Sequence, residues 1–213
     1  GKRMLDLTNN IPKPLLKIKN NTLLSNTINF FSEIGCNKIY INTHYLHNKI
    51  ENYVIQNFNN DTVNIIYEPS ILGTGGGIKN IFNYTKNNKI CVVNSDIFWE
   101  NTNKHDIINF LKNFSEVTHC KILLSKNDNF SGLKKNHGDF NFINGNVKNW
   151  DKGSEIIFYS GLQILSKDVF QKMPKVFSMN DIWNGLIIDK QLKGSIMPSK
   201  ILHIGDKKSF DCL

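Results

Sequence analysis

A single carboxylate closes a short apolar run in the first half of the chain. Residues 89–96 read KICVVNSD, so Asp96 follows an apolar run and two short polar residues. Such runs are typical of strands that are buried on both faces of a parallel sheet. Ligands of these sheets bind beyond the carboxyl ends of the strands, where a carboxylate can meet a hard cation or a phosphate-bearing substrate. The alternative interpretation is a strand that simply ends in an Asx-type turn.

A run of glycines lies one predicted helix ahead of this strand. Residues 72–77 read LGTGGG, and Ile78, Ile81 and Phe82 continue at helical spacing. Glycine has no Cβ, so backbone at such a junction can approach a flat ligand or a phosphate, and helix N-termini present free N–H groups to anions. A flexible loop is the alternative. The position just upstream of Asp96 favours a ligand site.

The elements around these residues alternate between strands and helices. Strands are predicted over residues 38–42, 63–67, 89–93 and 121–124, and helices over residues 22–35, 47–58, 78–82 and 107–114. This alternation indicates an α/β, Rossmann-like, mixed and mainly parallel sheet with helices on both faces.

After Ser125 the pattern changes. Asn144-Gly145 indicates a two-residue hairpin turn between alternating segments. An apolar strand over residues 156–165, broken at Ser160-Gly161, a helix through residues 182–187 and two short strands near residues 195–197 and 201–204 follow. We expect an antiparallel extension of the same sheet, and a single domain over residues 1–213.

Composition narrows the partner classes. The net charge is +8, but the lysines are scattered and Arg3 is the only arginine, which disfavours a nucleic-acid partner. No apolar stretch is long enough to cross a bilayer, so no membrane partner is expected. The four cysteines lack C-x-x-C spacing and indicate reduced thiols and a cytoplasmic location.

Several short motifs occur in the order found in one enzyme family. They are GKRMLDLT at residues 1–8, PKPL at 12–15, NTHYL at 42–46, GTGGG at 73–77, NSD at 94–96, GDF at 138–140, SGLQIL at 160–165 and FSMN at 177–180. Together they resemble the sugar-phosphate nucleotidyltransferases, in particular bacterial enzymes similar to N-acetylmuramate-1-phosphate uridylyltransferase and mannose-1-phosphate guanylyltransferase. The resemblance covers essentially the whole chain.

The resemblance implies an in-line attack of a sugar-1-phosphate oxygen on the α-phosphorus of a nucleoside triphosphate, with release of pyrophosphate and with Mg²⁺ as cofactor. Arg3 would pair with the triphosphate, and Gly1 would turn backbone amides toward the phosphates. Lys13 would stabilise charge on the α-phosphate, and Asp96 would hold Mg²⁺. Lys13 could instead be a solvated loop lysine, and Arg3 a disordered terminal residue.

The same resemblance implies two binding regions. The nucleobase would be bordered by Glu68, Gly75 and Gly76. The sugar would be bordered by Asp139, Ser160, Gly161 and Asn180. Glu68 could instead simply end a strand, and Asn180 could only cap a helix.

The chain departs from the family pattern in two places. The family opens with a strand and a glycine-rich loop of the form L-A-A-G-x-G-x-R-M-x-P-L-T, and residues 1–8 look like its second half. The first strand and the first loop glycine are therefore lacking, and we expect an incomplete N-terminus. Many members end in W-x-D-[IV]-G-T-P, whose Asp is a second metal carboxylate, whereas His203 occupies that place here. His203 could act through water, Asp206 could compensate, or one metal contact could be lost.

The predicted function is synthesis of a nucleoside-diphosphate sugar in cell-wall recycling, first from UTP and N-acetylmuramate 1-phosphate and second from GTP and mannose 1-phosphate. A catalytically impaired nucleotide-sugar-binding module is the main rival, because of the shortened loop and His203. An RNA-binding protein is a third alternative, which predicts steeply salt-dependent binding to polyanions. The sequence gives no indication of oligomeric state.

Overall fold

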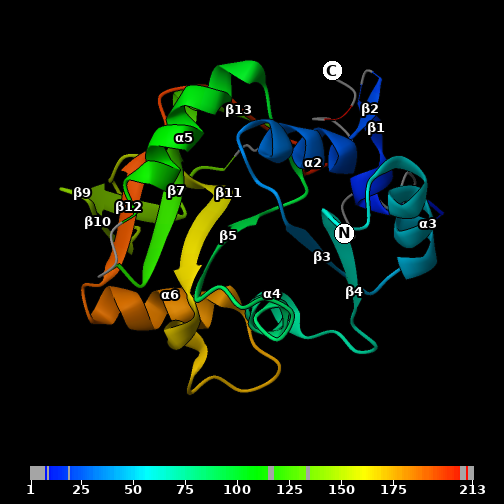
Figure 1. The fold of residues 1–213 in the computed structure, drawn as a ribbon. Helices are drawn as coiled ribbons and strands as arrows, with labels where there is room; N and C mark the ends of the chain where they lie inside the picture. The colour runs from blue at the N-terminus through cyan, green and yellow to red at the C-terminus, as the bar shows by residue number, and fades with distance from the viewer. Residues whose placement is uncertain are drawn as a thin grey trace.

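The computed structural model describes residues 8, 10–18, 20–114, 118–132, 135–206 and 210 (Figure 1). The predicted site residues Gly1 and Arg3 lie outside the described residues. No described helix is long and apolar enough to cross a membrane.

The first half of the chain builds strand–helix units. Its elements are η2 (Lys13–Leu15), β1 (Lys17–Ile18), β2 (Asn21–Thr22), α2 (Leu23–Glu33), β3 (Ile39–Thr43), α3 (His47–Asn57), β4 (Val63–Tyr67), α4 (Gly73–Ile81) and β5 (Lys89–Val93). Helix α2 begins where predicted because Thr22 and Ser25 form a capping box, with both backbone N–H groups 3.0 Å from the partner hydroxyl. It ends before Gly35, whose φ of +100° favours glycine.

The second half supplies the remaining strands and two helices. They are β6 (Ile97–Phe98), η3 (Asn101–Asn103), α5 (Lys104–Lys112), β7 (Cys120–Lys126), η4 (Asn127–Asn129), β8 (Phe130–Ser131), β9 (Phe140–Ile143), β10 (Asn146–Asn149), β11 (Ile157–Ser166), η5 (Lys167–Phe170), α6 (Met179–Ile188), β12 (Leu192–Ile196) and β13 (Ile201–His203). The predicted hairpin joins β9 to β10, and Asn144 and Gly145 both have positive φ there.

The strands form a six-stranded sheet in the order β5-β11-β7-β12-β10-β9, a β3-β4 pair, a β6-β13-β8 sheet and a β1-β2 hairpin. The predicted fold class, a mixed α/β sheet with helices, is confirmed. The antiparallel share was underestimated, because β11 is not an extension at the edge. It lies between β5 and β7 and runs antiparallel to both, while β3–β4, β7–β12 and β8–β13 are parallel.

Helices cover the strands from two sides (Figure 1). On one side, α2 and α5 contribute Phe30, Phe31, Ile107 and Phe110 to one apolar cluster. On the other side, α4 and α6 contact each other, and the second cluster includes residues of both. Helix α3 shares a further cluster with α2 and with residues of β3 and β4.

One expectation about the strand that ends near Asp96 is wrong. Strand β5 was predicted to be buried on both faces, but Cys91 is exposed and the other four residues are only half-buried. The reason lies in the topology, since β5 is an edge strand that pairs only with β11 within the described residues.

Candidate active site

Lys13 and Asp96 form an ion pair although 83 positions separate them in the chain. The Lys13 ammonium donates to Asp96 Oδ2 at 2.9 Å, and the two side chains are 19% and 27% exposed. Lys13 opens η2 between two prolines, and the N–H groups of Leu15 and Leu16 close this turn on Pro12 and Lys13 carbonyls. The rigid turn therefore places the lysine at the carboxyl end of β5. The resulting ion pair is largely buried, but part of each side chain remains accessible to solvent.

Strand pairing places His203 beside the same carboxylate. His203 lies opposite Ile97 in the β6–β13 pair, and the Ile204 N–H donates to the Asp96 carbonyl at 2.8 Å. As a result His203 Nε2 lies 3.5 Å from Asp96 Oδ2. The ring also packs against Gly205, where a Cβ would overlap it. The family resemblance suggested a role for this histidine, and the sheet register places it beside Asp96.

The surroundings of Asp96 keep it ionised. Burial opposes the charge, but the contact with His203 and the positive charge of Lys13 outweigh it and hold the pKa of Asp96 well below its ordinary value of 3.8. The carboxylate is therefore available as an anion throughout the neutral range.

Two atoms of this cluster have unused bonding capacity. Asp96 Oδ1 and His203 Nδ1 are buried and have no hydrogen-bond partner within the part of the chain that the structure describes. Buried polar atoms without partners are costly, so each of these two atoms requires an explanation, such as a water or an ion. The described residues contain no group of three or more His, Cys, Asp or Glu side chains that could hold a metal. One carboxylate and one imidazole fit a divalent cation that takes its other ligands from phosphates and water.

A bulge in β11 lies next to the segment that carries Asp96. The register with β7 shifts between Tyr159 and Gln163, and Gly161 has a φ of +87°. The Gly161 carbonyl accepts from the Asn94 N–H at 2.8 Å, and a Cβ on Gly161 would lie 2.9 Å from Ile97. The predicted break at Ser160-Gly161 is thus a bulge, a device found beside active sites. The Ser160 side chain is fully buried and accepts from the Leu162 N–H at 3.3 Å, so it supports this bulge.

The glycine run has a different local structure from the one predicted. Helix α4 starts at Gly73, so Gly75, Gly76 and Gly77 lie within its first turns and are buried. Glycine inside a helix costs about 1 kcal/mol relative to Ala. Close packing explains it, because a Cβ on Gly75 or Gly76 would overlap the segment 175–177, and the Phe177 carbonyl accepts from both of their N–H groups. The segment 175–177 therefore covers Gly75 and Gly76 here, and their nucleobase role stays a prediction.

Glu68 lies beside this helix rather than in solvent. It is 5% exposed, and its Oε1 accepts from Asn42 Nδ2 at 3.1 Å. A Cβ on Gly77 would lie 2.9 Å from the same oxygen. Because Gly77 has no side chain, the Glu68–Asn42 pair can pack directly against α4, at the carboxyl ends of β3 and β4.

The remaining predicted sugar residues lie on other elements. Both carboxylate oxygens of Asp139 accept hydrogen bonds from the protein. Oδ1 accepts from Lys135 at 2.9 Å, and Oδ2 accepts from the Tyr159 N–H at 3.1 Å. Asn180 is exposed in the first turn of α6, and its N–H donates to the Ser178 cap at 3.2 Å. The contacts bring together Lys13, Asp96 and His203, with Gly161 adjacent, and they do not join Asp139 or Asn180 to that group.

Two features escaped the sequence analysis. Phe177 covers the glycine run, and Tyr159 has a buried hydroxyl without a partner among the described residues, packed edge-on against Trp183 at 5.0 Å between centroids. Burial raises the pKa of Tyr159 well above 10. The sequence does not show whether an aromatic residue within an apolar run faces a site or packs in the core.

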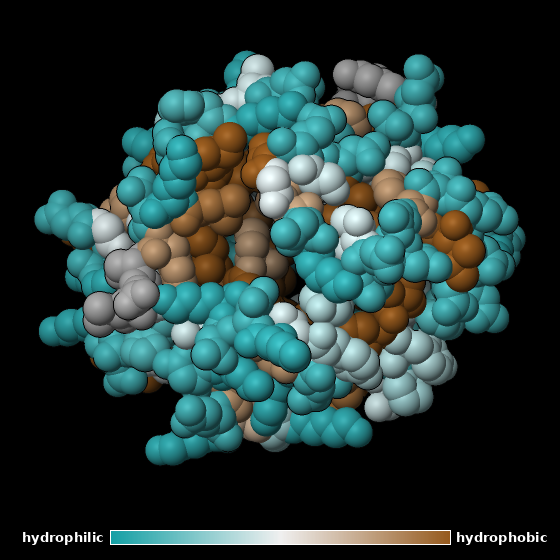
Figure 2. All heavy atoms as spheres, viewed as in Figure 1, coloured by the Kyte–Doolittle hydropathy of each residue, from teal (hydrophilic) through white to brown (hydrophobic). Residues whose placement is uncertain are grey.

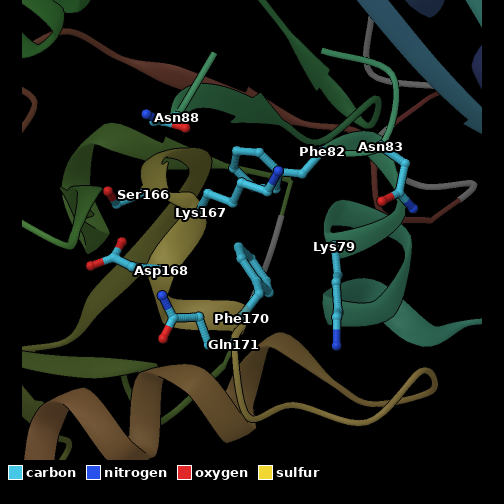
Figure 3. Close-up of a pocket in the computed structure, with 9 residues that line it drawn as sticks. All are labelled: Lys79, Phe82, Asn83, Asn88, Ser166, Lys167, Asp168, Phe170 and Gln171. Atoms are coloured by element: carbon cyan, nitrogen blue, oxygen red, sulfur yellow. The ribbon is translucent and has the colours of Figure 1, made fainter. Parts of the chain in front are cut away.

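A cavity of about 510 Å³ lies elsewhere, at the opposite end of β5 from Asp96 (Figure 3). Residues of α4 face those that end β11 across it, and the lining is Lys79, Phe82, Asn83, Asn88, Ser166, Lys167, Asp168, Phe170 and Gln171. Ser166 pairs with Lys89 at the start of β5, which fixes this location. The cavity is therefore separate from the Lys13–Asp96 cluster.

Comparison with known proteins shows which family the chain belongs to. Residues 1–131, more than half of the chain, match the Nucleotidyl transferase family. The chain belongs to this family. The matched region includes Lys13 and Asp96, whereas His203 lies outside it.

Two curated relatives of this nucleotidyl transferase are named D-glycero-alpha-D-manno-heptose 1-phosphate guanylyltransferase. The protein from Aneurinibacillus thermoaerophilus is 30% identical over 96 residues, which is 45% of this chain and 42% of the relative's length. The protein from Campylobacter jejuni is 25% identical over 172 residues, which is 80% of this chain and 73% of the relative.

Solved structures show the same fold. HddC from Yersinia pseudotuberculosis complexed with GMP-PN is 24% identical, with a TM-score of 0.75 over 95% of this chain and 88% of that one. The inositol-1-phosphate CTP transferase from T. maritima is 14% identical, with a TM-score of 0.77 over 98% of this chain and 86% of that one.

Proposed function

We propose that this nucleotidyl transferase joins a sugar 1-phosphate to a nucleoside triphosphate. A phosphate oxygen of the sugar attacks the α-phosphorus, the bond from the α-phosphorus to the bridging oxygen breaks, and pyrophosphate leaves with that oxygen. The observation that carries the proposal is the Lys13–Asp96–His203 cluster at the carboxyl end of β5. This reaction needs positioned charge and requires no nucleophilic side chain.

Lys13 and Asp96 take different parts in this reaction. The Lys13 ammonium would neutralise charge that builds on the α-phosphate in the transition state, a term worth about two to three orders of magnitude in rate. Asp96, ionised and next to Lys13, keeps the ammonium oriented and offers its second oxygen to a cation. Arg3 and Gly1, as predicted, would bind the triphosphate.

Asp96 and His203 are the described residues that would hold a divalent cation. Bound Mg²⁺ would supply charge neutralisation and a template for the phosphates. Imidazole nitrogen suits Mn²⁺ or Co²⁺ better than Mg²⁺, which prefers oxygen. One carboxylate and one imidazole therefore predict a stronger preference for Mn²⁺ or Co²⁺ over Mg²⁺ than two carboxylates would give.

The metal preference can be measured on binding alone. We expect the protein to bind Mn²⁺ at least about tenfold more tightly than Mg²⁺, and His203→Asp to narrow that ratio, because oxygen replaces nitrogen. Electron paramagnetic resonance of free Mn²⁺, with Mg²⁺ as competitor, gives both dissociation constants. His105→Asp, on α5 and hydrogen-bonded only locally to Asn109, is the matched control. An unchanged ratio in His203→Asp would exclude His203 as a ligand.

For the substrates we propose GTP and a sugar 1-phosphate of manno configuration. Both curated relatives carry a guanylyltransferase name with a manno-heptose 1-phosphate, which supports the second sequence expectation over the first. UTP with N-acetylmuramate 1-phosphate finds no support in these names.

A substrate panel tests the assignment. Four nucleoside triphosphates, each with manno-heptose 1-phosphate, mannose 1-phosphate or N-acetylmuramate 1-phosphate, are scored by pyrophosphate release. We expect kcat/KM with GTP and a manno-configured sugar to exceed that of every UTP pair by at least about tenfold, a difference of about 1.4 kcal/mol. Faster turnover of UTP with N-acetylmuramate 1-phosphate would reverse the substrate proposal. Tight nucleotide binding without any release would favour the impaired binding module.

A further inference from the structure

The cavity at the start of β5 lies between two lysine-rich segments. Residues of 79–89 and of 166–175 line it, and these two segments contain six lysines and a single acidic residue, Asp168. They therefore carry a net charge of +5, out of +8 for the whole chain. Figure 2 shows mostly hydrophilic residues on the lower part of one face, where the segment between η5 and α6 runs in Figure 1. Such a concentration of positive charge around a concave surface attracts anions.

Backbone contacts hold the two sides of the cavity together. Ser166 pairs with Lys89 across β11 and β5, and the Lys167 N–H donates to the Asn88 carbonyl at 2.8 Å. The Ser166 N–H donates to the His119 carbonyl at 2.9 Å. Because these main-chain bonds join neighbouring elements of the sheet, the cavity is largely preformed, as ligand sites usually are.

Two lysine side chains reach the cavity from different elements (Figure 3). Lys79 comes from α4, and its ammonium donates to the Met173 carbonyl, which uses one of its three hydrogens. Lys167 comes from the end of β11, and its ammonium has no hydrogen-bond or ion-pair partner among the described residues. Two ammonium groups with unused hydrogens can bind the oxygens of a phosphate-bearing ligand.

The single carboxylate of the cavity is already paired. Asp168 Oδ2 lies 2.5 Å from His119 Nδ1. With a neutral His119, the side chains of Lys79, Lys167 and Asp168 still leave a net positive charge, and a protonated His119 raises it further. The cavity therefore remains attractive to an anion in either state of the histidine.

The rest of the lining suits the body of a sugar. Asn83, Asn88 and Gln171 supply three amides, which both donate and accept hydrogen bonds, as hydroxyl groups do. Phe82 and Phe170, with ring centroids 5.5 Å apart, form the apolar part of the lining. A volume of about 510 Å³ is in the range of small-molecule sites and can hold a phosphorylated sugar or a nucleotide.

We propose that this cavity is a second ligand site, which binds a phosphorylated sugar with the phosphate on Lys79 and Lys167 and the hydroxyl groups on the amides. A free sugar phosphate and the sugar-phosphate part of a nucleotide share this chemistry. The cavity lies at the opposite end of β5 from Asp96, so this binding is separate from the proposed reaction.

The proposed ligand also contacts the segment that covers the glycine run. Gln171 lines the cavity, and the Met173 carbonyl accepts from Lys79. Farther along, the Phe177 carbonyl accepts from N–H groups of the glycine run. Residues 171–177 thus connect the cavity to the start of α4, and a ligand bound to Lys79 and Gln171 stabilises them in this position, because their opening would break its contacts.

Covalent labelling of lysines tests the location and the chemistry of the ligand. Lysines are acetylated with and without ribose 5-phosphate, and mass spectrometry gives the rate at each position. A dissociation constant of about 1 mM and about 10 mM ligand would slow acetylation of Lys79 and Lys167 about tenfold, and we expect at least about fivefold. Lys104, on α5 and paired with Glu33, is the internal control and should not change.

Two further ligands separate the sources of the sugar phosphate. AMP that slows acetylation more than ribose 5-phosphate does would assign the site to nucleotides, and the reverse order would assign it to free sugar phosphates. Equal slowing by inorganic phosphate would overturn the proposal, because the amides would then contribute nothing. Slowing at Lys13 without any at Lys79 and Lys167 would also overturn it, since the ligand would then lie at the catalytic cluster.

Lys167→Gln is the variant that tests the phosphate contact. Lys167 is exposed, so its replacement leaves the core intact. Protection of Lys79 by ribose 5-phosphate should fall below about twofold in this variant. It should stay unchanged in the matched control Lys172→Gln, which replaces an exposed lysine outside the lining. Full protection of Lys79 in Lys167→Gln would contradict a shared phosphate.

Hydrogen exchange tests the effect on the covering segment. With ribose 5-phosphate, amides of residues 73–77 should exchange at least about threefold more slowly in the unmodified protein and at an unchanged rate in Lys167→Gln. Exchange that is not slowed at saturating ligand, or that is slowed equally in Lys167→Gln, would overturn the proposed stabilisation of residues 171–177.

Discussion

Asp96→Asn is expected to lower kcat/KM for pyrophosphate release by at least about a hundredfold. The substitution keeps the shape of the side chain but removes the charge that faces Lys13 and His203. A neutral amide oxygen is a weaker ligand of a hard cation than a carboxylate and brings no negative charge to it. The KM for the nucleotide should change less than kcat, because the charge matters most while the transition state forms.

The control for this variant is Asp168→Asn. Asp168 is also a carboxylate in an ion pair, with His119 Nδ1 at 2.5 Å from its Oδ2, but it lies at the other end of β11. Its loss should leave kcat/KM within about twofold of the unmodified protein. Equal rates for Asp96→Asn and the unmodified protein would remove Asp96 from the reaction.

Lys13→Ala is expected to reduce kcat by a similar factor, about a hundredfold or more. The prolines on either side of Lys13 fix its backbone, and Asp96 Oδ2 accepts from its ammonium at 2.9 Å, so the substitution removes a positioned charge. Lys13→Arg should restore little activity, since a planar guanidinium does not match the compact ammonium at a half-buried site.

Lys17→Ala is the matched control, because Lys17 is an exposed lysine of β1 only four positions away. Thermal unfolding of each variant separates loss of the fold from loss of function. A Lys13→Ala protein that unfolds normally and keeps full kcat would show that Lys13 is an ordinary solvated loop residue.

Local signals in the sequence predicted most elements correctly. Thr22 and Gly35 mark the ends of α2, and Asn144-Gly145 marks the β9–β10 turn, because each of these positions needs a particular side chain or φ. The position of β11 could not be predicted in this way. Which strands flank a given strand depends on contacts between residues far apart in the chain, and both edges of β11 carry similar apolar runs.

In the candidate site, too, local features could be predicted and long-range contacts could not. Lys13 and Asp96 could be singled out from motifs, and the structure joins them. The buried state of Gly75 and Gly76 could not, because it depends on the segment that ends at Phe177, about a hundred positions later. Strand β5 has the composition of a central strand but lies at a sheet edge within the described residues, because strand order depends on contacts far apart in the chain.

The most direct test of the central claim follows the α-phosphorus itself. GTP labelled at that atom is incubated with a manno-configured sugar 1-phosphate and a divalent cation, and the products are separated by charge. We predict that the label moves into a GDP-sugar in equal amount to the pyrophosphate released, and that this transfer is lost in both Asp96→Asn and Lys13→Ala. Label that stays in GTP, or transfer that persists without either charge, would contradict the account.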